Sequence, residues 1–127
     1  MIKAVLDASA VLSFLNEESG CREVEQLLPD AAVNAVNMAE VAGKLTERGG
    51  SYDEIRKIIE SLGVEVVSCD LPLALRIGHL RSGTRILRLS LGDRACLATA
   101  IHHDVPAVTA DRDWKTLKLG IKIQVIR

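Results

Sequence analysis

Four acidic residues, spread over most of the chain, stand where carboxylates could do chemistry together: Asp7, Glu40, Asp93 and Asp111. Carboxylates that are forced together repel one another and tend to hold protons, and a divalent cation removes this conflict. A ligand set of carboxylate oxygens without Cys or His suits Mg²⁺ or Mn²⁺ better than zinc. The four acids are therefore candidates for one site that binds a hard divalent cation.

Asp93 lies in the stretch SLGDRACLATA (residues 90–100), which has the pattern of a helix with Ser90 as its N-cap. At about 100° per residue, Asp93 falls on the same face as the apolar residues Leu97, Ala100 and Ile101. The third position of a capping box normally carries Glu or Gln, whereas this one carries Asp. A carboxylate on the buried face needs a partner or a cation, so Asp93 is the strongest functional candidate.

Asp7 and Asp111 each follow a short apolar run with the composition of a buried strand. Either acid also fits a structural role, as the N-cap or turn residue at the end of that strand. Ser9 offers an alternative cap beside Asp7, and Asp113 strengthens the turn interpretation of Asp111. Sequence position therefore leaves both interpretations of these two acids open.

Glu40 has the strongest structural alternative, because Asn37-x-x-Glu40 matches a capping box with Asn in place of Ser or Thr. The apolar stripe of this predicted helix consists of Met38, Val41 and Leu45, and Glu40 points away from it. Periodicity therefore does not bury Glu40, and its position alone favours a helix-capping role.

Apolar runs of strand length alternate along the chain with segments of helical periodicity. We predict five strands, at residues 2–6, 32–35, 64–68, 107–109 and 121–126. We predict six helices, at residues 8–17, 20–28, 38–48, 52–62, 70–82 and 90–103. This alternation predicts an α/β fold with three α/β/α layers and a central, mostly parallel five-stranded sheet. The length fits a single domain over residues 1–127.

This topology brings the acids toward one edge of the sheet. Ligands of open parallel sheets bind beyond the carboxyl ends of the strands, where Asp7 and Asp111 are placed. Glu40 and Asp93 lie in the first turns of predicted helices, where the positive end of the helix dipole favours a carboxylate. We therefore expect the four acids to belong to one site.

The charge balance limits how the chain can bind nucleic acid. With 16 Lys and Arg against 17 Asp and Glu, the formal net charge is −1, which argues against a polybasic nucleic-acid binder. Five arginines nevertheless crowd together with His79, namely Arg76, Arg81, Arg85, Arg88 and Arg94. Such a run is usually a solvated face, and it is also the best candidate for a phosphate contact.

The cysteines and the apolar runs indicate a compartment. Cys21, Cys69 and Cys96 are odd in number and far apart, as expected of thiols in a reducing environment. The N-terminus lacks the pattern of a signal peptide, and no apolar run reaches the roughly 18 residues of a membrane span. We therefore expect a cytoplasmic protein with no membrane partner.

Four segments together resemble the PIN-domain ribonucleases, and specifically the VapC toxins of type II toxin-antitoxin systems. They are VLDASAVLSFL (5–15), AVNMAEV (35–41), SLGDRACLATA (90–100) and AVTADRDW (107–114). The segments follow the order and spacing of that family, and the resemblance covers essentially the whole chain. Asn37 stands where many relatives carry Ser or Thr, and none of the four acids is missing.

The resemblance implies a metal-dependent endoribonuclease that holds Mg²⁺ or Mn²⁺. Its catalytic, metal-binding acids would be Asp7, Glu40, Asp93 and Asp111, with Glu40 either a further ligand or the base that orients water. Two residues would be polar supports of the site, namely Ser9 and Thr109. Water would attack the RNA phosphodiester and leave a 5′-phosphate and a 3′-hydroxyl.

The resemblance also implies partners, namely an RNA substrate, a second copy in a homodimer and a cognate VapB-type antitoxin that covers the acidic site. The candidate RNA contacts are four arginines, Arg81, Arg85, Arg88 and Arg94. With one Phe, one Tyr and one Trp, the chain offers little for base stacking.

An alternative from another class is a non-catalytic, Mg²⁺-binding receiver-like module, or an aspartyl phosphatase. A receiver has paired acids after its first strand, whereas Leu6 precedes Asp7 here. The phosphatase chemistry needs a second acid two residues on, where this chain has Ser9. RNA cleavage that is lost on chelation would exclude both alternatives, and phosphoryl labelling of Asp7 would favour them.

Overall fold

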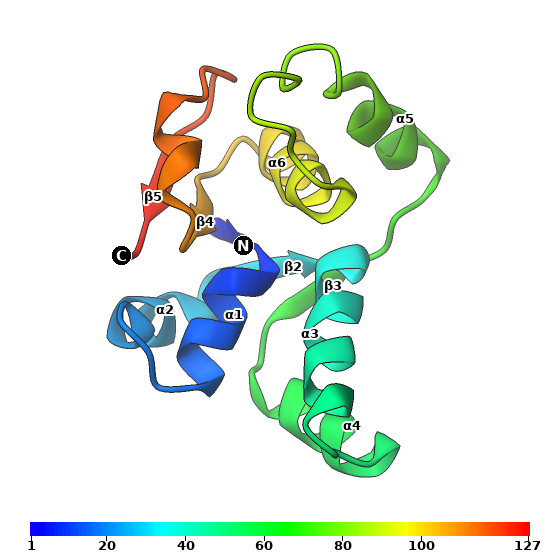
Figure 1. The fold of residues 1–127 in the computed structure, drawn as a ribbon, viewed down its shortest axis with the longest axis vertical. Helices are drawn as coiled ribbons and strands as arrows, with labels where there is room; N and C mark the ends of the chain where they lie inside the picture. The colour runs from blue at the N-terminus through cyan, green and yellow to red at the C-terminus, as the bar shows by residue number, and fades with distance from the viewer.

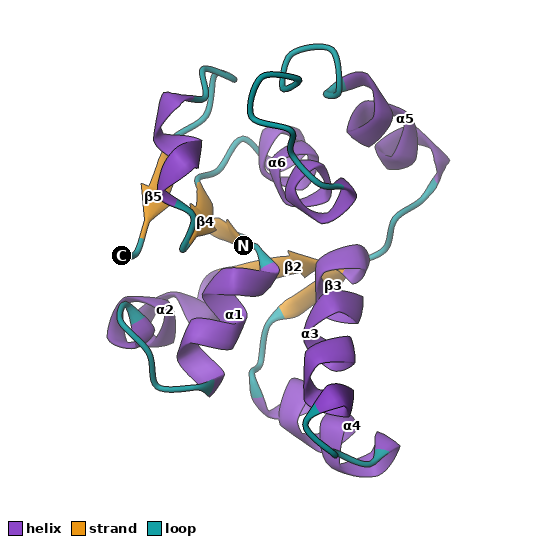
Figure 2. Cartoon of the chain, viewed as in Figure 1, coloured by secondary structure: helices purple, strands orange, loops and turns teal.

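A sheet of five parallel strands forms the middle of the molecule (Figures 1 and 2). The computed structural model describes all 127 residues. The strands are β1 (Ala4–Leu6), β2 (Ala31–Asn34), β3 (Glu65–Val67), β4 (Ala107–Thr109) and β5 (Ile123–Val125). They lie in the order β3-β2-β1-β4-β5, and all four neighbouring pairs are parallel. The predicted five-stranded sheet is thus confirmed, and it is parallel throughout.

Helices cover both faces of this sheet and complete the predicted three layers. They are α1 (Ala8–Leu15), α2 (Cys21–Leu27), α3 (Ala35–Glu47), α4 (Tyr52–Ser61), α5 (Leu71–His79) and α6 (Leu91–His103), with short 3₁₀ helices η1 (Leu28–Asp30) and η2 (Arg112–Thr116). Helices α1 to α4 lie on one side of the sheet, and α5 and α6 on the other (Figure 1). No helix combines the length and the apolar character that a bilayer crossing requires.

Neighbouring residues of β1 face opposite layers, as the two-residue period of a strand requires. Ala4 and Leu6 pack in a core shared with α1, α2 and α3. Val5 packs on the other face, in a core that includes Leu97 of α6 and the fully buried Trp114 of η2. Burial on both faces explains why this strand has no polar alternation in the sequence.

Helix α3 begins three residues before the predicted start at residue 38, and β2 ends one residue before its predicted end. Asn34 is the N-cap, because its side-chain oxygen accepts a hydrogen bond from the Val36 amide at 2.8 Å. The predicted capping box Asn37-x-x-Glu40 is therefore wrong, since Asn37 lies inside the helix. Its side chain is buried and donates to the Glu40 carboxylate and to α6 instead.

The strand order reverses direction between β1 and β4. The chain adds β2 and β3 on one side of β1, and β4 and β5 on the other. Such a switch point in a parallel sheet opens a crevice at the carboxyl ends of the two strands, where ligands bind. The order also differs from the flavodoxin-like order 2-1-3-4-5 of receiver folds. The crevice between β1 and β4 is thus the place to look for a site.

Candidate active site at the β1–β4 switch point

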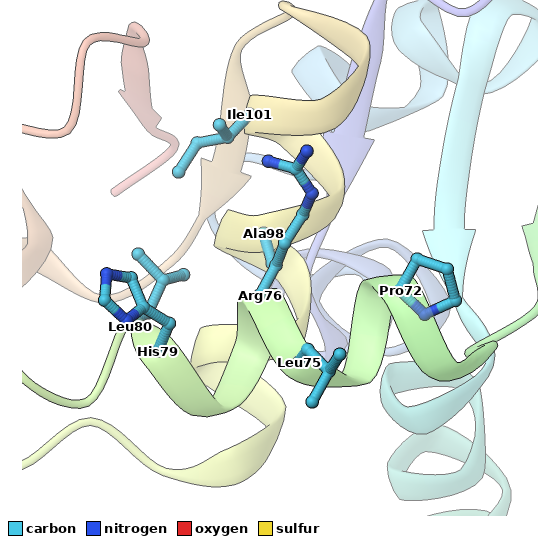
Figure 3. A pocket seen from close by; sticks show the side chains of 7 residues that line it. All are labelled: Pro72, Leu75, Arg76, His79, Leu80, Ala98 and Ile101. Atoms are coloured by element: carbon cyan, nitrogen blue, oxygen red, sulfur yellow. The ribbon is translucent and has the colours of Figure 1, made fainter.

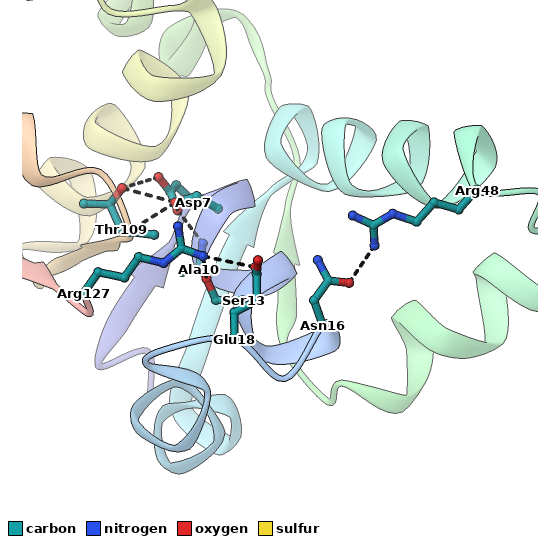
Figure 4. Close-up of polar contacts among 10 residues, drawn as sticks. Asp7, Ala10, Ser13, Asn16, Glu18, Arg48, Thr109 and Arg127 are labelled. Atoms are coloured by element: carbon teal, nitrogen blue, oxygen red, sulfur yellow. Dashed lines mark hydrogen bonds and ion pairs between the residues drawn. The ribbon is translucent and has the colours of Figure 1, made fainter.

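Asp7 directly follows β1, and its carboxylate lies at the centre of a buried hydrogen-bond network. Oδ1 accepts from the Ser9 hydroxyl at 2.7 Å and from the Ala10 amide at 2.8 Å, which makes Asp7 the N-cap of α1. Oδ2 accepts from the Thr109 hydroxyl at 2.5 Å (Figure 4). Ser9 and Thr109 thus hold the carboxylate in one orientation.

Burial changes the acidity of this carboxyl group. Asp7 is only 4% exposed, and loss of hydration raises its pKa from 3.8 to about 6. Hydrogen bonds from Thr109, Ser9 and the Ala10 amide oppose that rise, and the charge of Asp93 adds to it. No basic side chain forms an ion pair with Asp7, although its charge is buried. The charged form therefore lacks the cationic partner that would stabilise it.

Asp111 follows β4 on the same edge of the sheet, as predicted. Its backbone amide donates to the Thr109 hydroxyl at 3.0 Å, so one hydroxyl joins the Asp111 backbone to the Asp7 carboxylate. The Asp111 side chain is exposed and caps η2 by accepting from the Asp113 amide at 2.9 Å. The turn interpretation from the sequence is thus confirmed, and it coexists with a position beside Asp7.

Asp93 lies in the first turn of α6 and is half-buried. Its Oδ2 accepts from the Ser90 amide at 3.0 Å, and the Ser90 hydroxyl accepts from the Asp93 amide at 3.1 Å. These two bonds form a capping box, so the helix start predicted at Ser90 is confirmed. The remaining oxygen, Oδ1, has no hydrogen-bond donor from the protein.

Glu40 reaches the same region from α3, where it meets the first turn of α6. The Asn37 amide group donates to the Gly92 carbonyl at 2.8 Å and to Glu40 Oε1 at 3.3 Å. A Cβ atom at position 92 would overlap Glu40 Oε1, so the carboxylate lies directly on the Gly92 backbone. Burial raises the pKa of Glu40, the Asn37 amide opposes this rise, and the charge of Asp93 adds to it.

Three of the four acids are close enough to act electrostatically on one buried group. Burial raises the pKa of the Cys96 thiol well above its usual value, and the charges of Asp7, Asp93 and Glu40 raise it further. None of the four acids forms an ion pair. No three acidic, His or Cys side chains enclose a common point as they stand, because Asp93 and Asp111 are each turned to a helix N-terminus.

The donor set nevertheless fits a hard divalent cation. All four side chains offer carboxylate oxygens, two of them have a raised pKa, and none has a basic partner. Burial raises the pKa values of Asp7 and Glu40, and the charge of Asp93 adds to the rise, so a cation at this edge of the sheet would stabilise the charged forms of both carboxylates.

Three residues of this region were not found from the sequence, namely Asn34, Thr99 and Gly92. Asn34 is fully buried, and it donates to the Thr99 hydroxyl of α6 at 3.0 Å while it caps α3. Gly92 lets the Glu40 carboxylate lie against the backbone of α6, because a Cβ atom at this position would overlap it. A glycine inside the first turn of a helix costs about 1 kcal/mol relative to alanine, and this cost is the signal that could have identified Gly92.

Two other hollows of the surface are lined by none of the four acids. A hollow of about 630 Å³ lies along the packed helices α5 and α6 and is lined mainly by apolar side chains of the two helices (Figure 3). A second pocket, of about 530 Å³, contains the four arginines predicted to contact RNA, namely Arg81, Arg85, Arg88 and Arg94. The structure therefore places these arginines together, at the start of α6.

Comparisons with known proteins agree with this architecture. A toxin-antitoxin complex from Klebsiella pneumoniae matches at 20% identity over 94% of this chain and 95% of that chain, with a TM-score of 0.74. DNA-bound VapBC from Salmonella typhimurium matches at 19% identity over 100% of both chains, with a TM-score of 0.76. VapC20 from Mycobacterium tuberculosis, a sarcin-ricin loop cleaving toxin, matches at 15% identity over 94% and 99%, with a TM-score of 0.71. The chain matches no curated protein sequence.

These structures share the fold of this chain, and a family model gives its membership. The model of the PIN domain matches residues 4–119, a segment that contains Asp7, Glu40, Asp93 and Asp111 together with all strands except β5. The chain therefore belongs to the PIN domain family.

Proposed function

We propose that this chain is a metal-dependent endoribonuclease and the VapC-type toxin of a toxin-antitoxin pair. The observation that carries the proposal is that Asp7 and Glu40 both lie within electrostatic reach of Asp93, have raised pKa values and, like Asp93, have no basic partner. Structural relatives support it, since they include toxin-antitoxin complexes and a toxin that cleaves the sarcin-ricin loop.

The site would hold Mg²⁺ or Mn²⁺ through Asp7, Asp93 and Asp111, with Glu40 as a further ligand or as the base. When bound, such a cation supplies Lewis-acid polarisation of the phosphoryl group and charge stabilisation of the leaving oxygen. The hydroxyls of Ser9 and Thr109 fix both oxygens of Asp7, so this carboxylate needs no reorganisation during the reaction.

The protein groups also account for the handling of protons. Because burial raises the pKa of Glu40, its carboxylate is a better proton acceptor than an exposed one and suits the removal of a proton from the attacking water. The Asn37 amide holds Glu40 Oε1 in place during this transfer. Attack by water, rather than by the ribose 2′-hydroxyl, leaves a 5′-phosphate and a 3′-hydroxyl.

Exposed apolar side chains support the proposal of protein partners. Leu71 and Leu75 of α5, Ile86 of the loop after α5 and Leu91 of α6 are all more than half exposed. Clusters of large exposed apolar residues mark protein interfaces. We propose a VapB-type antitoxin and a second copy of the chain as these partners, which size-exclusion chromatography with light scattering, with and without the antitoxin, would test.

The decisive experiment is RNA cleavage by antitoxin-free protein in Mg²⁺, in Mn²⁺ and in EDTA, with the product ends mapped. The matched variant is Asp93→Asn, which keeps an oxygen to accept from the Ser90 amide and so preserves the helix cap. We expect metal-dependent cuts with 5′-phosphate ends in the wild type and no cuts in the variant. Cleavage in EDTA, 2′,3′-cyclic phosphate ends, or full activity of the variant would contradict the proposal.

A further inference from the structure

The pocket at the start of α6 concentrates positive charge, and no acidic side chain lines it. Its lining combines Arg81, Arg85, Arg88 and Arg94 with Thr84, Leu89, Ser90 and Leu91, and contains no Asp or Glu. None of the four arginines forms an ion pair, in a chain whose formal net charge is −1. Guanidinium groups held together without counter-charges repel one another, so a bound anion would stabilise this arrangement.

Arg94 gives this pocket an independent sign of a missing ligand. The residue is only 9% exposed, and its Nη1 donates to the Ile77 carbonyl at 3.1 Å, which ties α6 to α5. Its Nε is buried and has no acceptor in the protein. An unpaired buried donor on a charged group is costly, and a ligand oxygen that accepts from Nε would remove that cost.

The pocket also includes the first residues of a 13-residue helix. The backbone amides of Leu91 and Gly92 have no acceptor within the helix, and the helix dipole adds partial positive charge at this end. Phosphate groups bind well at such helix N-termini. The pocket therefore combines four guanidinium groups with the N-terminus of a helix, and both favour a bound anion.

From these features we infer that the arginine pocket binds a backbone phosphodiester of RNA, one that is not the phosphate cleaved at the acids. The two sites share one helical turn, because Ser90 lines the pocket and caps the helix through Asp93. The pocket thus offsets the repulsion between RNA and the acidic crevice and sets the register of the strand. This inference rests on the proposed nuclease function for the nature of the ligand.

The test compares two variants that each lose three positive charges. The pocket variant is Arg81→Gln/Arg85→Gln/Arg88→Gly, in which Arg94 is kept because it ties α6 to α5. Arg88 has φ 50°, a left-handed conformation that glycine adopts at less cost, so this change does not strain the loop. The control variant is Arg22→Gln/Lys57→Gln/Lys122→Gln, whose exposed residues lie outside both sites.

Binding of a fluorescently labelled short RNA is measured by anisotropy in EDTA, over a range of KCl concentrations. We expect the Kd of the pocket variant to rise about tenfold or more above that of the control variant. The slope of log K against log salt should fall in magnitude by about 0.7 for each phosphate that the pocket held. In the wild type, the Arg94 Nε–H resonance should shift on titration with the same RNA.

Equal RNA affinity and salt slope of the two variants would overturn the inference and leave an acidic protein partner as the occupant of the pocket. An Arg94 Nε–H resonance that RNA does not move would overturn it as well. Binding in EDTA tests the arginine pocket, and cleavage in Mg²⁺ tests the nuclease, so one proposal can fail without the other. Loss of binding in the pocket variant, with no cleavage by the wild type, would uphold the pocket and reject the nuclease, and the reverse pattern would reject the pocket alone.

Discussion

Two junctions at the same edge of the sheet use the same local device with different results. Asp7 follows β1 and caps α1, and Asp111 follows the neighbouring β4 and caps η2. The Asp7 carboxylate is buried and accepts three hydrogen bonds, whereas the Asp111 side chain is exposed and accepts one from Asp113. Burial raises the pKa of Asp7 to about 6.

The difference between the two junctions arises from the residues that come after each acid. After Asp7 the chain continues with Ala8, Ala10 and Val11, which are buried and draw the start of α1 into the core. After Asp111 it continues with Arg112 and Asp113, which are both exposed, so the Asp111 side chain stays in solvent although Trp114 of the same turn is buried. A helix-capping acid therefore acquires a shifted pKa, and with it a possible catalytic role, only where the residues that follow it bury its carboxylate.

The largest test of this comparison is the effect of Asn at each position on RNA cleavage. Asn caps helices as well as Asp does, so both variants should fold. We expect Asp7→Asn to lower the cleavage rate by about a thousandfold, or about 4 kcal/mol, and Asp111→Asn by about tenfold. Initial rates at saturating Mg²⁺ measure both effects. Equal losses would show that burial does not distinguish the two acids.

The next effect concerns stability in the absence of divalent cations. Between pH 3.8 and about 6, folded Asp7 holds a proton that the unfolded chain has released. The free energy of unfolding should therefore fall as the pH rises through this window, by up to about 3 kcal/mol, and stay level above it. The Asp7→Asn variant lacks this loss and should be the more stable protein at pH 7.

Urea unfolding in EDTA, at several pH values, measures the difference between wild type and Asp7→Asn directly. The Asp111→Asn variant is the matched control, since its side chain is exposed. Mg²⁺ added at pH 7 should restore stability to the wild type but not to Asp7→Asn. A wild type that gains stability relative to Asp7→Asn between pH 4 and 6 would refute this account.

The sequence predicted the sheet, its helical layers and the acids at the β1–β4 edge, because apolar periodicity and strand ends are local signals. It misplaced the start of α3, because Asn34 and Asn37 are equally good caps by type. Only tertiary contacts separate them, since Asn34 donates to Thr99 and Asn37 to the Gly92 carbonyl of α6.

Asp93 shows the same limit within the predicted site. Its apolar helix face indicated an inward carboxylate, and the structure finds it half-buried, with one oxygen in the capping box. The sequence could not decide whether Asp93 caps the helix or takes part in catalysis, because one carboxylate oxygen can serve the cap while the other stays free. The exposure of Asp111 was equally beyond sequence, because it depends on how the turn after β4 meets solvent.

A smaller effect on RNA cleavage is expected at Gly92, where the Glu40 carboxylate lies against the backbone of α6. In Gly92→Ala the new methyl group would displace the Glu40 carboxylate, which is the mobile end of a flexible side chain. Alanine also favours the helix by about 1 kcal/mol, so the fold should not lose stability. We expect RNA cleavage to fall by about tenfold or more with unchanged or higher Tm.

The control for this change is Gly43→Ala, in α3, where an added methyl group meets no atom. It should keep the cleavage rate and gain a similar amount of helix stability. If Gly92→Ala cleaved RNA as well as Gly43→Ala does, the position of the Glu40 carboxylate on α6 would have no role in catalysis.

The smallest effect is expected on removal of the Thr109 hydroxyl, which bonds to both the Asp7 carboxylate and the Asp111 amide. The Thr109 hydroxyl donates to Asp7 Oδ2 and stabilises the charged carboxylate, so Thr109→Val should raise the pKa of Asp7 above 6, by about 1. Thr109→Ser keeps the hydroxyl and should keep the pKa. Carbon-13 NMR of the Asp7 carboxyl group in EDTA measures both values.

Because the same hydroxyl accepts from the Asp111 amide, Thr109→Val should also loosen the first turn of η2, visible as faster amide exchange at Asp111. An unchanged pKa with faster exchange would mean that the hydroxyl serves the exposed junction and not the buried acid.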